Sequence, residues 1–224
     1  MKAKAVVLLS AGMDSTVNLF ATVAEAQVVL ALTFDYGQRA AAKEILCAER
    51  LCKKLQVRHS VVELPFIKGF GKSSLTDSSQ SVPVGSEIAM DDLNTCLETA
   101  KSVWVPNRNG IFLNVAAGFA ESLGADWIVP GFNREEAETF PDNSEAFLEA
   151  TTRALSFSTA NKIKIKCFTT DKDKTEIVQL GEKMKVDWKM MWPCYFSGDK
   201  WCGECESCQR SKRALVASGI RIFE

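Results

Sequence analysis

The sequence predicts an α/β fold with a doubly wound, mostly parallel five-stranded sheet and a small cysteine-rich tail. Short apolar, β-branched runs alternate along the chain with longer stretches of helical periodicity, as in strands joined by crossover helices. These runs are apolar at consecutive positions, which is typical of parallel strands buried on both faces. In addition, four of the eight cysteines lie close together near the C-terminus.

Each expected element has its own signal. A strand candidate is a run of apolar and β-branched residues, beginning with "AVVLLS" at 5–10. In the helix candidate "QRAAAKEILCAERLCKKL" (38–55), one apolar stripe repeats at helical spacing and is expected to face a core. A Ser- and Gly-rich stretch at 65–103 interrupts the alternation and is expected to be a functional or mobile loop. The expected strands are 5–10, 28–34, 57–64, 127–132 and 162–168, and the expected helices are 14–24, 38–55, 109–123, 144–156 and 173–184.

Composition excludes several classes of protein. With 27 Lys and Arg against 28 Asp and Glu, the chain has no overall basic charge, so we expect no stable nucleic-acid binding. No apolar run approaches the roughly 20 residues of a membrane helix, and Met1–Ala5 lacks the features of a signal peptide. We therefore expect a cytoplasmic protein. The 224 residues are enough for one sizeable core and a small appendage.

The first strand ends in a small polar turn, "LSAGMDST" (9–16), whose residue types suit an anionic ligand. In an open parallel sheet, ligands bind beyond the carboxyl ends of the strands, near the point where strand order reverses. A helix that starts at Asp14 or Ser15 would direct free N–H groups to that point. Ser10 adds a hydroxyl donor, and Gly12 allows close approach of the backbone. These residues alone leave two interpretations open: a phosphate-binding loop, or a glycine turn before a capped helix.

This turn resembles the SGGxDS pyrophosphate loop of the N-type ATP pyrophosphatases, the superfamily of GMP synthetase, asparagine synthetase and tRNA thiolation enzymes. Ser10, Gly12, Asp14 and Ser15 match, and Ala11 stands where the motif has its first glycine. Alanine is tolerated there at a negative φ and is destabilising at a positive one. The resemblance implies a Rossmann-like fold of the adenine nucleotide alpha hydrolase type. It also implies an enzyme that cleaves ATP between the α and β phosphates and adenylates an acceptor oxygen.

The second group of candidate residues is the spacing C-x7-C-x2-C-x2-C, formed by Cys194, Cys202, Cys205 and Cys208. Four thiolates at such spacings favour one tetrahedral structural zinc, with Gly203 easing the turn between two ligands. An iron–sulfur cluster also accepts four thiolates, and two disulfides or a redox role are further alternatives. A closed four-cysteine site leaves no position for substrate, so its expected role is to fold the tail.

Together the two motifs resemble one family, the 7-cyano-7-deazaguanine synthases of queuosine and archaeosine precursor synthesis, over nearly the whole chain. Two departures are Ala40, where the family often has His, and the acidic "REEAET" at 134–139. Because of these departures, two alternatives to an ordinary family member stay open: a subgroup of the family, or a relative that acts on a related acceptor. The segments found in the family's order are "TFDYGQR" (33–39), "VPNRNGIFL" (105–113), "GFN" (131–133), "FPD" (140–142), "DKTEIVQLG" (173–181) and "WPCY" (192–195).

The resemblance implies an ATP-dependent carbon–nitrogen ligase that converts 7-carboxy-7-deazaguanine and ammonia into 7-cyano-7-deazaguanine through an acyl adenylate and an amide. It further implies ATP, Mg²⁺, one structural Zn²⁺ per chain, and a homodimer without a membrane partner. We expect an ATP-binding domain at 1–188 and a zinc-binding region at 189–224. One rival is a tRNA-thiolating enzyme of the same superfamily, which would need a catalytic cysteine and a basic surface. The other is a non-catalytic zinc-ribbon module, for which a nucleotide-binding sheet would be superfluous.

Site residues follow from the same resemblance. Arg108, Arg39 and Lys174 are the cations expected near the phosphates or the substrate carboxylate. Asp142 is expected to accept from the ring N1–H and exocyclic amine, with Phe140 stacked on the ring. Asp14 is expected as a helix cap or an outer-shell metal partner. The expected ATP-binding residues are Leu8, Leu9, Ser10, Ala11, Gly12, Met13, Asp14, Ser15, Thr16, Val17, Asn18 and Arg39, and the expected substrate or catalytic residues are Arg108, Asn133, Phe140, Asp142 and Lys174.

Overall fold

A five-stranded sheet forms the centre of the computed structural model, which describes residues 2–88 and 92–222. The strand order is β3-β2-β1-β4-β5, and each pairing in the sheet is parallel. The predicted fold is confirmed, and the sheet is wholly rather than mostly parallel. The strands are β1 Lys4–Leu8, β2 Gln27–Asp35, β3 His59–Glu63, β4 Trp127–Val129 and β5 Lys164–Ile165.

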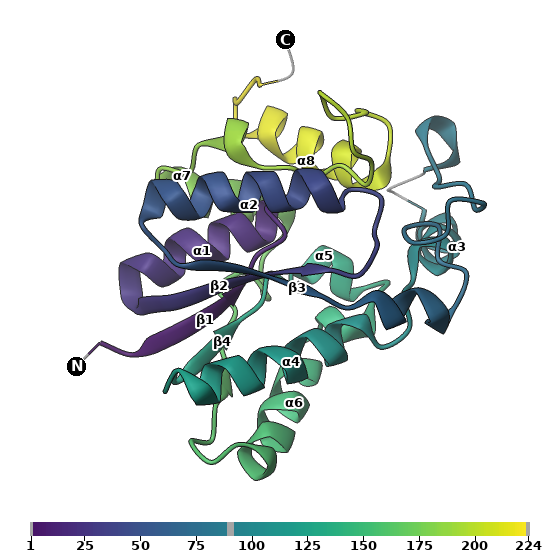
Figure 1. The fold of residues 1–224 in the computed structure, drawn as a ribbon. Coiled ribbons are helices and arrows are strands. Elements are labelled where there is room, and N and C mark those ends of the chain that lie inside the picture. The colour runs from purple at the N-terminus through teal and green to yellow at the C-terminus, as the bar shows by residue number, and fades with distance from the viewer. Residues whose placement is uncertain (1, 89–91, 223–224) are drawn as a thin grey trace.

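Helices cover both faces of the sheet, as Figure 1 shows. Side chains of β1 alternate between two cores, with Ala5 and Val7 in one and Val6 and Leu8 in the other. Buried residues of α1, α2, α7 and α8 complete the first core, and those of α4 and α6 complete the second. These helices are α1 Met13–Glu25, α2 Ala41–Leu55, α4 Arg108–Ser122, α6 Glu145–Ser158, α7 Lys174–Lys183 and α8 Glu206–Ala217.

Four of the five strands are shorter than expected, and β4 and β5 lose half or more of their expected length. β4 ends at Val129 because the next residue, Pro130, has no backbone N–H to donate to a neighbouring strand. β5 lies at the edge of the sheet and pairs with β4 through Lys164 and Ile165 alone. The reversal of strand order nevertheless falls where expected, between β1 and β4. Ligands of doubly wound proteins bind at this point, beyond the carboxyl ends of the strands.

The stretch 65–103 is only partly a loop. It contains short 3₁₀ turns and one helix, α3 Leu93–Val103, that was not predicted; residues 89–91 lie outside the described part of the chain. The Asp92 carboxylate caps α3 by accepting the Thr95 N–H at 3.2 Å. The Asp-x-x-Thr pattern was therefore a local helix signal, obscured by the polar residues before it.

The middle of this stretch is attached to the cysteine-rich tail. Val84 forms an antiparallel bridge with Cys205, and the Gly85 N–H donates to the Glu204 carbonyl at 3.0 Å. The Gln209 side chain of α8 also donates to the Gly85 carbonyl. In Figure 1 the two segments accordingly lie side by side at one end of the sheet.

Candidate active site

A cavity of ≈ 240 Å³ lies at the reversal point of the sheet. Segments far apart in the chain line it: the turn after β1, the end of β2, the starts of α2 and α4, the turn after β4, and the tail. Most of the predicted site residues are brought together here. They are Leu8, Leu9, Ser10, Gly12, Met13, Asp14, Ser15, Arg108, Phe140, Asp142 and Lys174.

The turn after β1 is closed by its own hydroxyl groups. The Gly12 N–H donates to Ser10 Oγ at 3.3 Å, Ser15 Oγ donates to the Gly12 carbonyl at 3.2 Å, and the two hydroxyl oxygens lie 3.2 Å apart. The Thr16 N–H donates to the Gly12 carbonyl at 3.0 Å, so the helical amides before Thr16 have no acceptor within α1. We call Ser10–Ser15 the donor loop. Its free amides and the positive end of the helix dipole suit an anion.

Ala11 takes the strained conformation that a glycine would accept freely. Its φ is 59°, in the left-handed region, which costs an alanine roughly 1 kcal/mol. The surroundings hold this conformation, since Ala11 is fully buried and its carbonyl accepts the Trp192 N–H at 2.7 Å. Gly131 supports the loop from β4 because a Cβ there would lie 2.5 Å from Ser15 N. The donor loop is therefore fixed by the sheet and by the tail.

Asp14, Lys174 and Glu136 form a buried cluster next to the donor loop. Lys174 Nζ lies 2.6 Å from Asp14 Oδ2 and 2.7 Å from Glu136 Oε1, and only 5% of the Lys174 side chain is exposed. Asn133 Nδ2 also donates to Asp14 Oδ2, whereas Asp14 Oδ1 is buried with no hydrogen-bond partner in the described part of the chain. The expected capping role of Asp14 is wrong, because α1 begins at Met13 and no side-chain hydrogen bond caps it.

The charged groups of this cluster shift one another's pKa values. Burial raises the pKa of Asp14 to about 6, against the attraction of Lys174. Burial would lower the pKa of Lys174, but Asp14 and Glu136 outweigh burial and raise it. Burial would likewise raise the pKa of Glu136, but Lys174 outweighs burial and lowers it. Asp14 is thus the member that gains a proton most easily, and with all three ionised the cluster carries one net negative charge.

The acidic segment "REEAET" folds into the short helix α5 Arg134–Ala137 and supplies a second ion network. Glu135 Oε2 lies 3.1 Å from Arg210 Nη1 and also pairs with Arg213. Arg210 in turn lies 2.8 Å from Glu206, four residues earlier on α8. Glu135 and Glu136 therefore pair with bases of α7 and α8. These pairs were not predicted, although the i, i+4 spacing of Glu206 and Arg210 was a readable signal.

Another part of the cavity is aromatic. The rings of Trp104 and Phe140 are stacked, with their planes 6° from parallel and their centroids 6.0 Å apart. Phe34 stacks on Phe112 with centroids 4.3 Å apart. Flat apolar walls of this kind suit a planar ring. Trp104 was not predicted; it directly follows the stretch 65–103, which was expected to be a loop.

Arg108, the first residue of α4, is the cation of this part of the cavity. Its Nη1 donates to Tyr36 Oη and its Nε to Asn109 Oδ1, both at 3.3 Å. Burial would lower the pKa of Arg108, but Tyr36 and Asp142 outweigh burial and raise it. Burial raises the pKa of Asp142, in spite of Arg108. Within residues 2–88 and 92–222, no carboxylate forms an ion pair with Arg108, which therefore keeps donors for a ligand.

Glu44, in the first turn of α2, also lines the cavity and is half-buried. Gln38 Nε2 donates to Glu44 Oε2 at 2.8 Å and to the Phe34 carbonyl at 3.0 Å, while Gln38 Oε1 accepts the Tyr36 N–H at 3.0 Å. Burial raises the pKa of Glu44 to about 7, although the Gln38 hydrogen bond and Arg108 both lower it. A single acid in an amphipathic helix carries no local signal, so Glu44 was not predicted.

Some predicted residues do not line the cavity. Arg39 holds the stretch 65–103 instead, with Nε donating to the Ser74 carbonyl at 2.7 Å and Nη2 to the Gln80 carbonyl at 2.6 Å. Asn18 supports the donor loop from behind, because its Nδ2 donates to the Asp14 carbonyl at 2.9 Å. The predicted residues outside the cavity lining are Ala11, Thr16, Val17, Asn18, Arg39 and Asn133.

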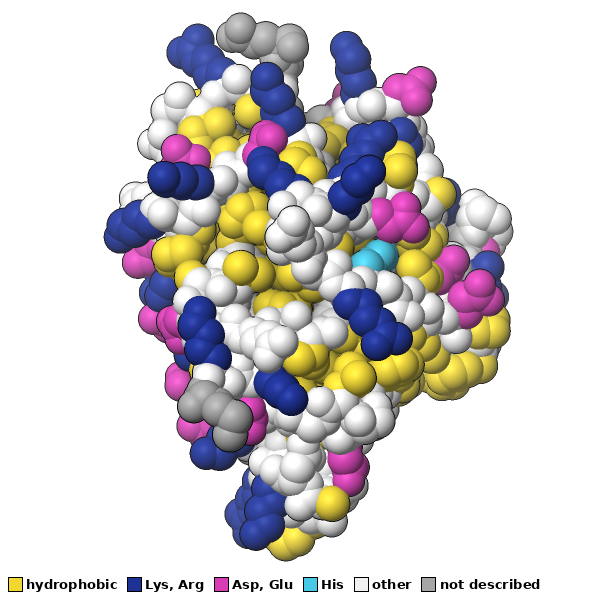
Figure 2. Space-filling view, turned by 60° about the vertical axis from the view of Figure 1, so that its left-hand side comes forward, with side chains coloured by type: hydrophobic (Ala, Val, Ile, Leu, Met, Phe, Trp, Pro, Cys, Tyr) yellow, Lys and Arg dark blue, Asp and Glu magenta, His cyan; other side chains and the backbone are white. Residues whose placement is uncertain are grey.

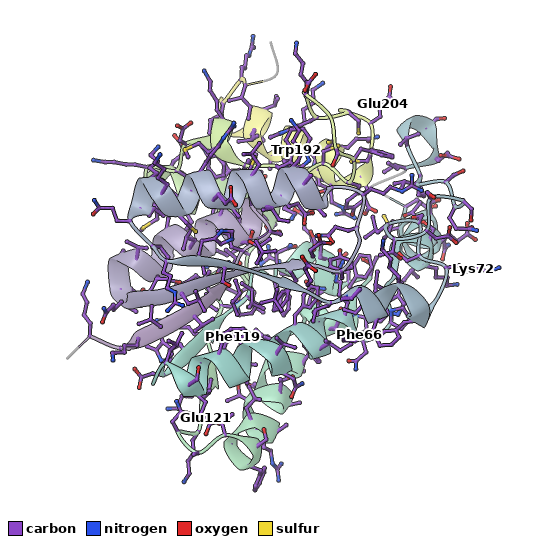
Figure 3. The ribbon with its side chains drawn as sticks, in the orientation of Figure 1. Phe66, Lys72, Phe119, Glu121, Trp192 and Glu204 are labelled. Carbon is purple, nitrogen blue, oxygen red and sulfur yellow. The ribbon has the colours of Figure 1, made fainter. Side chains whose placement is uncertain are left out.

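The four cysteines of the tail come together as predicted. Their sulfur atoms lie within 4.8 Å of one another, and a tetrahedral zinc with bonds of about 2.3 Å needs separations of about 3.8 Å. The Cys202 N–H donates to Cys194 Sγ at 3.4 Å and the Cys205 N–H to Cys202 Sγ at 3.3 Å. Such outer hydrogen bonds stabilise thiolate ligands, so the residues present fit a zinc ion. The same arrangement brings Trp192 between α2 and the tail, as Figure 3 shows.

A doubly wound parallel sheet with a donor loop at its reversal point has the fold of a nucleotide-binding α/β protein, and the four-cysteine tail joined to it could hold a metal ion. The sequence model of the family described as queuosine biosynthesis protein QueC matches residues 4–219. The chain belongs to this family.

Curated relatives have the same extent as the chain. A 7-cyano-7-deazaguanine synthase of Bdellovibrio bacteriovorus is 57% identical over 220 residues, covering 98% of this chain and 95% of the relative. The enzyme of the same name from Desulforudis audaxviator is 48% identical and covers 98% of this chain and 100% of the relative. One from Methanobrevibacter smithii is 41% identical, with 99% and 96% covered.

Solved structures with similar architecture are more distant. An NMN synthetase from Francisella tularensis superposes with a TM-score of 0.48 at 13% identity, covering 99% of this chain and 79% of that chain. A 4-thiouridine synthetase solved with RNA and bound ATP superposes with a TM-score of 0.48 at 18% identity, covering 81% of this chain and 40% of that chain.

Proposed function

We propose that the protein is an ATP-dependent ligase that converts 7-carboxy-7-deazaguanine and ammonia into 7-cyano-7-deazaguanine. One observation carries the proposal: a single cavity holds the donor loop together with Arg108 and the parallel rings of Trp104 and Phe140. A phosphate chain and a flat anionic acid bound in one cavity of this size would lie close enough to react. The name of the relatives, 7-cyano-7-deazaguanine synthase, supports the same assignment.

The chemistry needs activation because a carboxylate is anionic and has no good leaving group. In the first step, a substrate carboxylate oxygen attacks the α-phosphorus of ATP, and pyrophosphate leaves. The acyl carbon then carries AMP as its leaving group, and ammonia displaces AMP to form an amide. Activation of the amide oxygen in the same way, followed by loss of AMP, gives the nitrile. The Ser10 and Ser15 hydroxyls and the free amides of the donor loop would bind the phosphates.

For the substrate ring we retain Asp142 as the acceptor for N1–H and the exocyclic amine, and Phe140 as a stacking face. Arg108 would bind the substrate carboxylate, since its guanidinium keeps donors that no described residue occupies. The rings of Trp104 and Phe140 lie in nearly parallel planes, so the substrate ring could lie parallel to both.

Mg²⁺ and Zn²⁺ would have separate roles. The Asp14–Lys174–Glu136 cluster is net negative when ionised, so phosphates beside it require a cation, and Asp14 Oδ1 is a hard oxygen without a partner among residues 2–88 and 92–222. Bound Mg²⁺ would supply neutralising charge at the phosphates. One Zn²⁺ per chain, held by Cys194, Cys202, Cys205 and Cys208, would fold the tail without touching the reacting atoms.

We further propose a cytoplasmic homodimer that has no stable nucleic-acid partner, with the division into 1–188 and 189–224 described above. The net charge of −1 supports the absence of nucleic acid. On the face drawn in Figure 2, Lys and Arg are interspersed with acidic and hydrophobic side chains. Among the helices of residues 2–88 and 92–222, none is both long and apolar enough to cross a bilayer.

Product analysis tests the proposed function directly. The protein is incubated with 7-carboxy-7-deazaguanine, ATP, Mg²⁺ and ammonium, and the products are identified by mass spectrometry, because acid, amide and nitrile differ in mass. We expect the nitrile, with release of AMP and pyrophosphate. Accumulation of the adenylate alone, or transfer to another amine, would identify a different acceptor. Absence of ATP consumption would reject the proposal.

A further inference from the structure

We propose that Glu44 is the base that takes a proton from ammonium and so generates the ammonia that attacks the acyl adenylate. This inference rests on the proposed function and adds to it a catalytic residue and a binding position for the nitrogen donor. At neutral pH most ammonia in water is ammonium, which has no lone pair for attack. A cavity that uses ammonium therefore needs an acceptor for one proton.

The carboxylate of Glu44 is held in place with one oxygen free. Gln38 Nε2 binds Oε2 at 2.8 Å, and the Gln38 amide is itself fixed by the Phe34 carbonyl and the Tyr36 N–H. Oε1 has no hydrogen-bond partner in the described part of the chain, and the residue lines the cavity. A positioned carboxylate with an open oxygen can accept a hydrogen bond from ammonium and then its proton.

The other titratable residues of the cavity are already engaged. Asp142 accepts from Asn143 Nδ2 at 3.2 Å and is assigned to the substrate ring. The single histidine of the sequence, His59, lies outside the cavity lining and bonds Thr33 Oγ1 at 2.7 Å. The remaining acids are bonded to cations, Asp14 and Glu136 to Lys174, and Glu206 to Arg210.

The surroundings of Glu44 bring its pKa near neutral pH, and Asp14, whose pKa also rises, is already bonded to Lys174. Burial raises the pKa of Glu44 to about 7, the Gln38 bond and Arg108 lower it, and Asp35 raises it. Tyr36, and Cys47 one turn along α2, have pKa values that burial raises above their ordinary values, so both are neutral at neutral pH. A base with a pKa near the working pH is both available and strong enough to accept a proton.

The proposed step balances as follows. The Glu44 carboxylate takes one proton from ammonium, which leaves neutral ammonia and a carboxylic acid. The nitrogen lone pair forms a bond to the acyl carbon of the adenylate, and the bond from that carbon to the AMP oxygen breaks, with its electron pair leaving on AMP. The nitrogen then loses one further proton to water, which gives the amide. Glu44 returns its proton to solvent before the next turnover.

Glu44→Gln tests the proposal, because the glutamine carbonyl can still accept from Gln38 while the base is lost. Exchange of pyrophosphate into ATP, driven by 7-carboxy-7-deazaguanine, should be unchanged, since adenylation precedes ammonia. Amide formation at neutral pH with subsaturating ammonium should fall roughly 100-fold. Glu49→Gln, on the exposed side of the same helix, is the matched control and should change neither rate. Failure of pyrophosphate exchange in the wild-type protein would instead defeat the proposed function.

Two further readouts separate a base from a structural residue. Hydroxylamine is already neutral at neutral pH, so hydroxamate formation should be the same in Glu44→Gln and wild type. Wild-type amide formation should rise with pH and level off above about 7, as Glu44 loses its proton. The Gln variant should instead rise steadily as free ammonia increases.

Glu44→Asp, which keeps a carboxylate, should keep the wild-type pH profile at a reduced rate, and it replaces the Gln variant if that variant does not fold. Equal losses with ammonium and hydroxylamine in either variant would overturn the proposal. So would loss of pyrophosphate exchange in a folded variant, or wild-type rates in Glu44→Gln.

Discussion

The two halves of the cavity are built in different ways. The half that would bind phosphates is the donor loop, six consecutive residues at the end of one strand, in which Ser10, Gly12 and Ser15 bond one another. The half around Arg108 draws Tyr36, Glu44 and Trp104 from three separate segments of the chain. Bonds within one short segment therefore shape the first half, and the sheet and the tail hold it in place. Docking of the stretch 65–103 and of the tail onto the sheet determines the second.

Because the two halves are built differently, we expect substitutions in them to affect stability and activity to different degrees. Changes that disturb tertiary docking should lower the free energy of unfolding, and damage activity as a consequence. Changes to hydroxyl groups of the donor loop should lower activity while the fold persists. The four predictions below test this separation and are ordered from the largest expected effect to the smallest.

Removal of one zinc ligand should have the largest effect. A structural zinc contributes roughly 10 kcal/mol or more of binding free energy, so Cys208→Ala should lose the metal and unfold the tail. Metal analysis and thermal unfolding of protein purified without chelator measure both. Cys47→Ala, a buried cysteine outside the cluster, is the matched control and should keep one zinc per chain. Iron with visible absorbance in the wild type would contradict the zinc assignment.

Lys174→Met should come next. It leaves the buried Asp14 and the partly exposed Glu136 without their cation, which costs about 3–5 kcal/mol of unfolding free energy. Denaturant unfolding measures this loss. Lys172→Met removes a lysine whose partner, Asp171, is largely exposed, and should change stability little. Equal losses in the two variants would show that the cluster is not the source of the effect.

Ser10→Ala should lower activity much more than stability, unlike the two variants above. Loss of a donor at a developing phosphate charge lowers kcat/KM by roughly 100-fold, while loss of its weak loop bonds costs about 1 kcal/mol of stability. Steady-state kinetics and denaturant unfolding of one preparation give both numbers. Ser158→Ala, an exposed serine at the end of α6, should leave both unchanged. A Ser10→Ala variant with the wild-type rate would reduce the loop to an ordinary turn.

Ala11→Gly should have the smallest effect, in the stabilising direction. Glycine adopts the observed φ of 59° without steric cost, but it gains freedom in the unfolded chain and loses a buried methyl group. The expected gain is therefore at most about 1 kcal/mol. Thermal unfolding at fixed zinc content measures it. A clear loss of stability would mean that packing of the methyl group matters more than backbone strain.

The two halves also differ in how far the sequence predicts them. The five strands, the main helices, the donor loop and the cysteine cluster were predicted because each depends on a local pattern of adjacent residues. Glu44 and Trp104 were not predicted, because only tertiary packing brings them to the cavity. Arg39 fits a phosphate-binding arginine by type, yet it binds backbone carbonyls of the stretch 65–103, and no local signal distinguishes these roles.

The two residues between Cys205 and Cys208 have two roles, because they separate two of the four cysteines and also form part of the cavity wall. Glu206 and Ser207 occupy the two positions between Cys205 and Cys208, and both line the cavity. In an ordinary metal knuckle these spacer positions tolerate many residues, since only the sulfur atoms bind the ion. Here the spacer is part of the cavity wall, and Glu206 also anchors Arg210. A four-cysteine segment from another protein, with the same ligand spacing, would therefore restore metal binding if it replaced this one. It would restore the cavity wall only if it also kept Glu206 and Ser207.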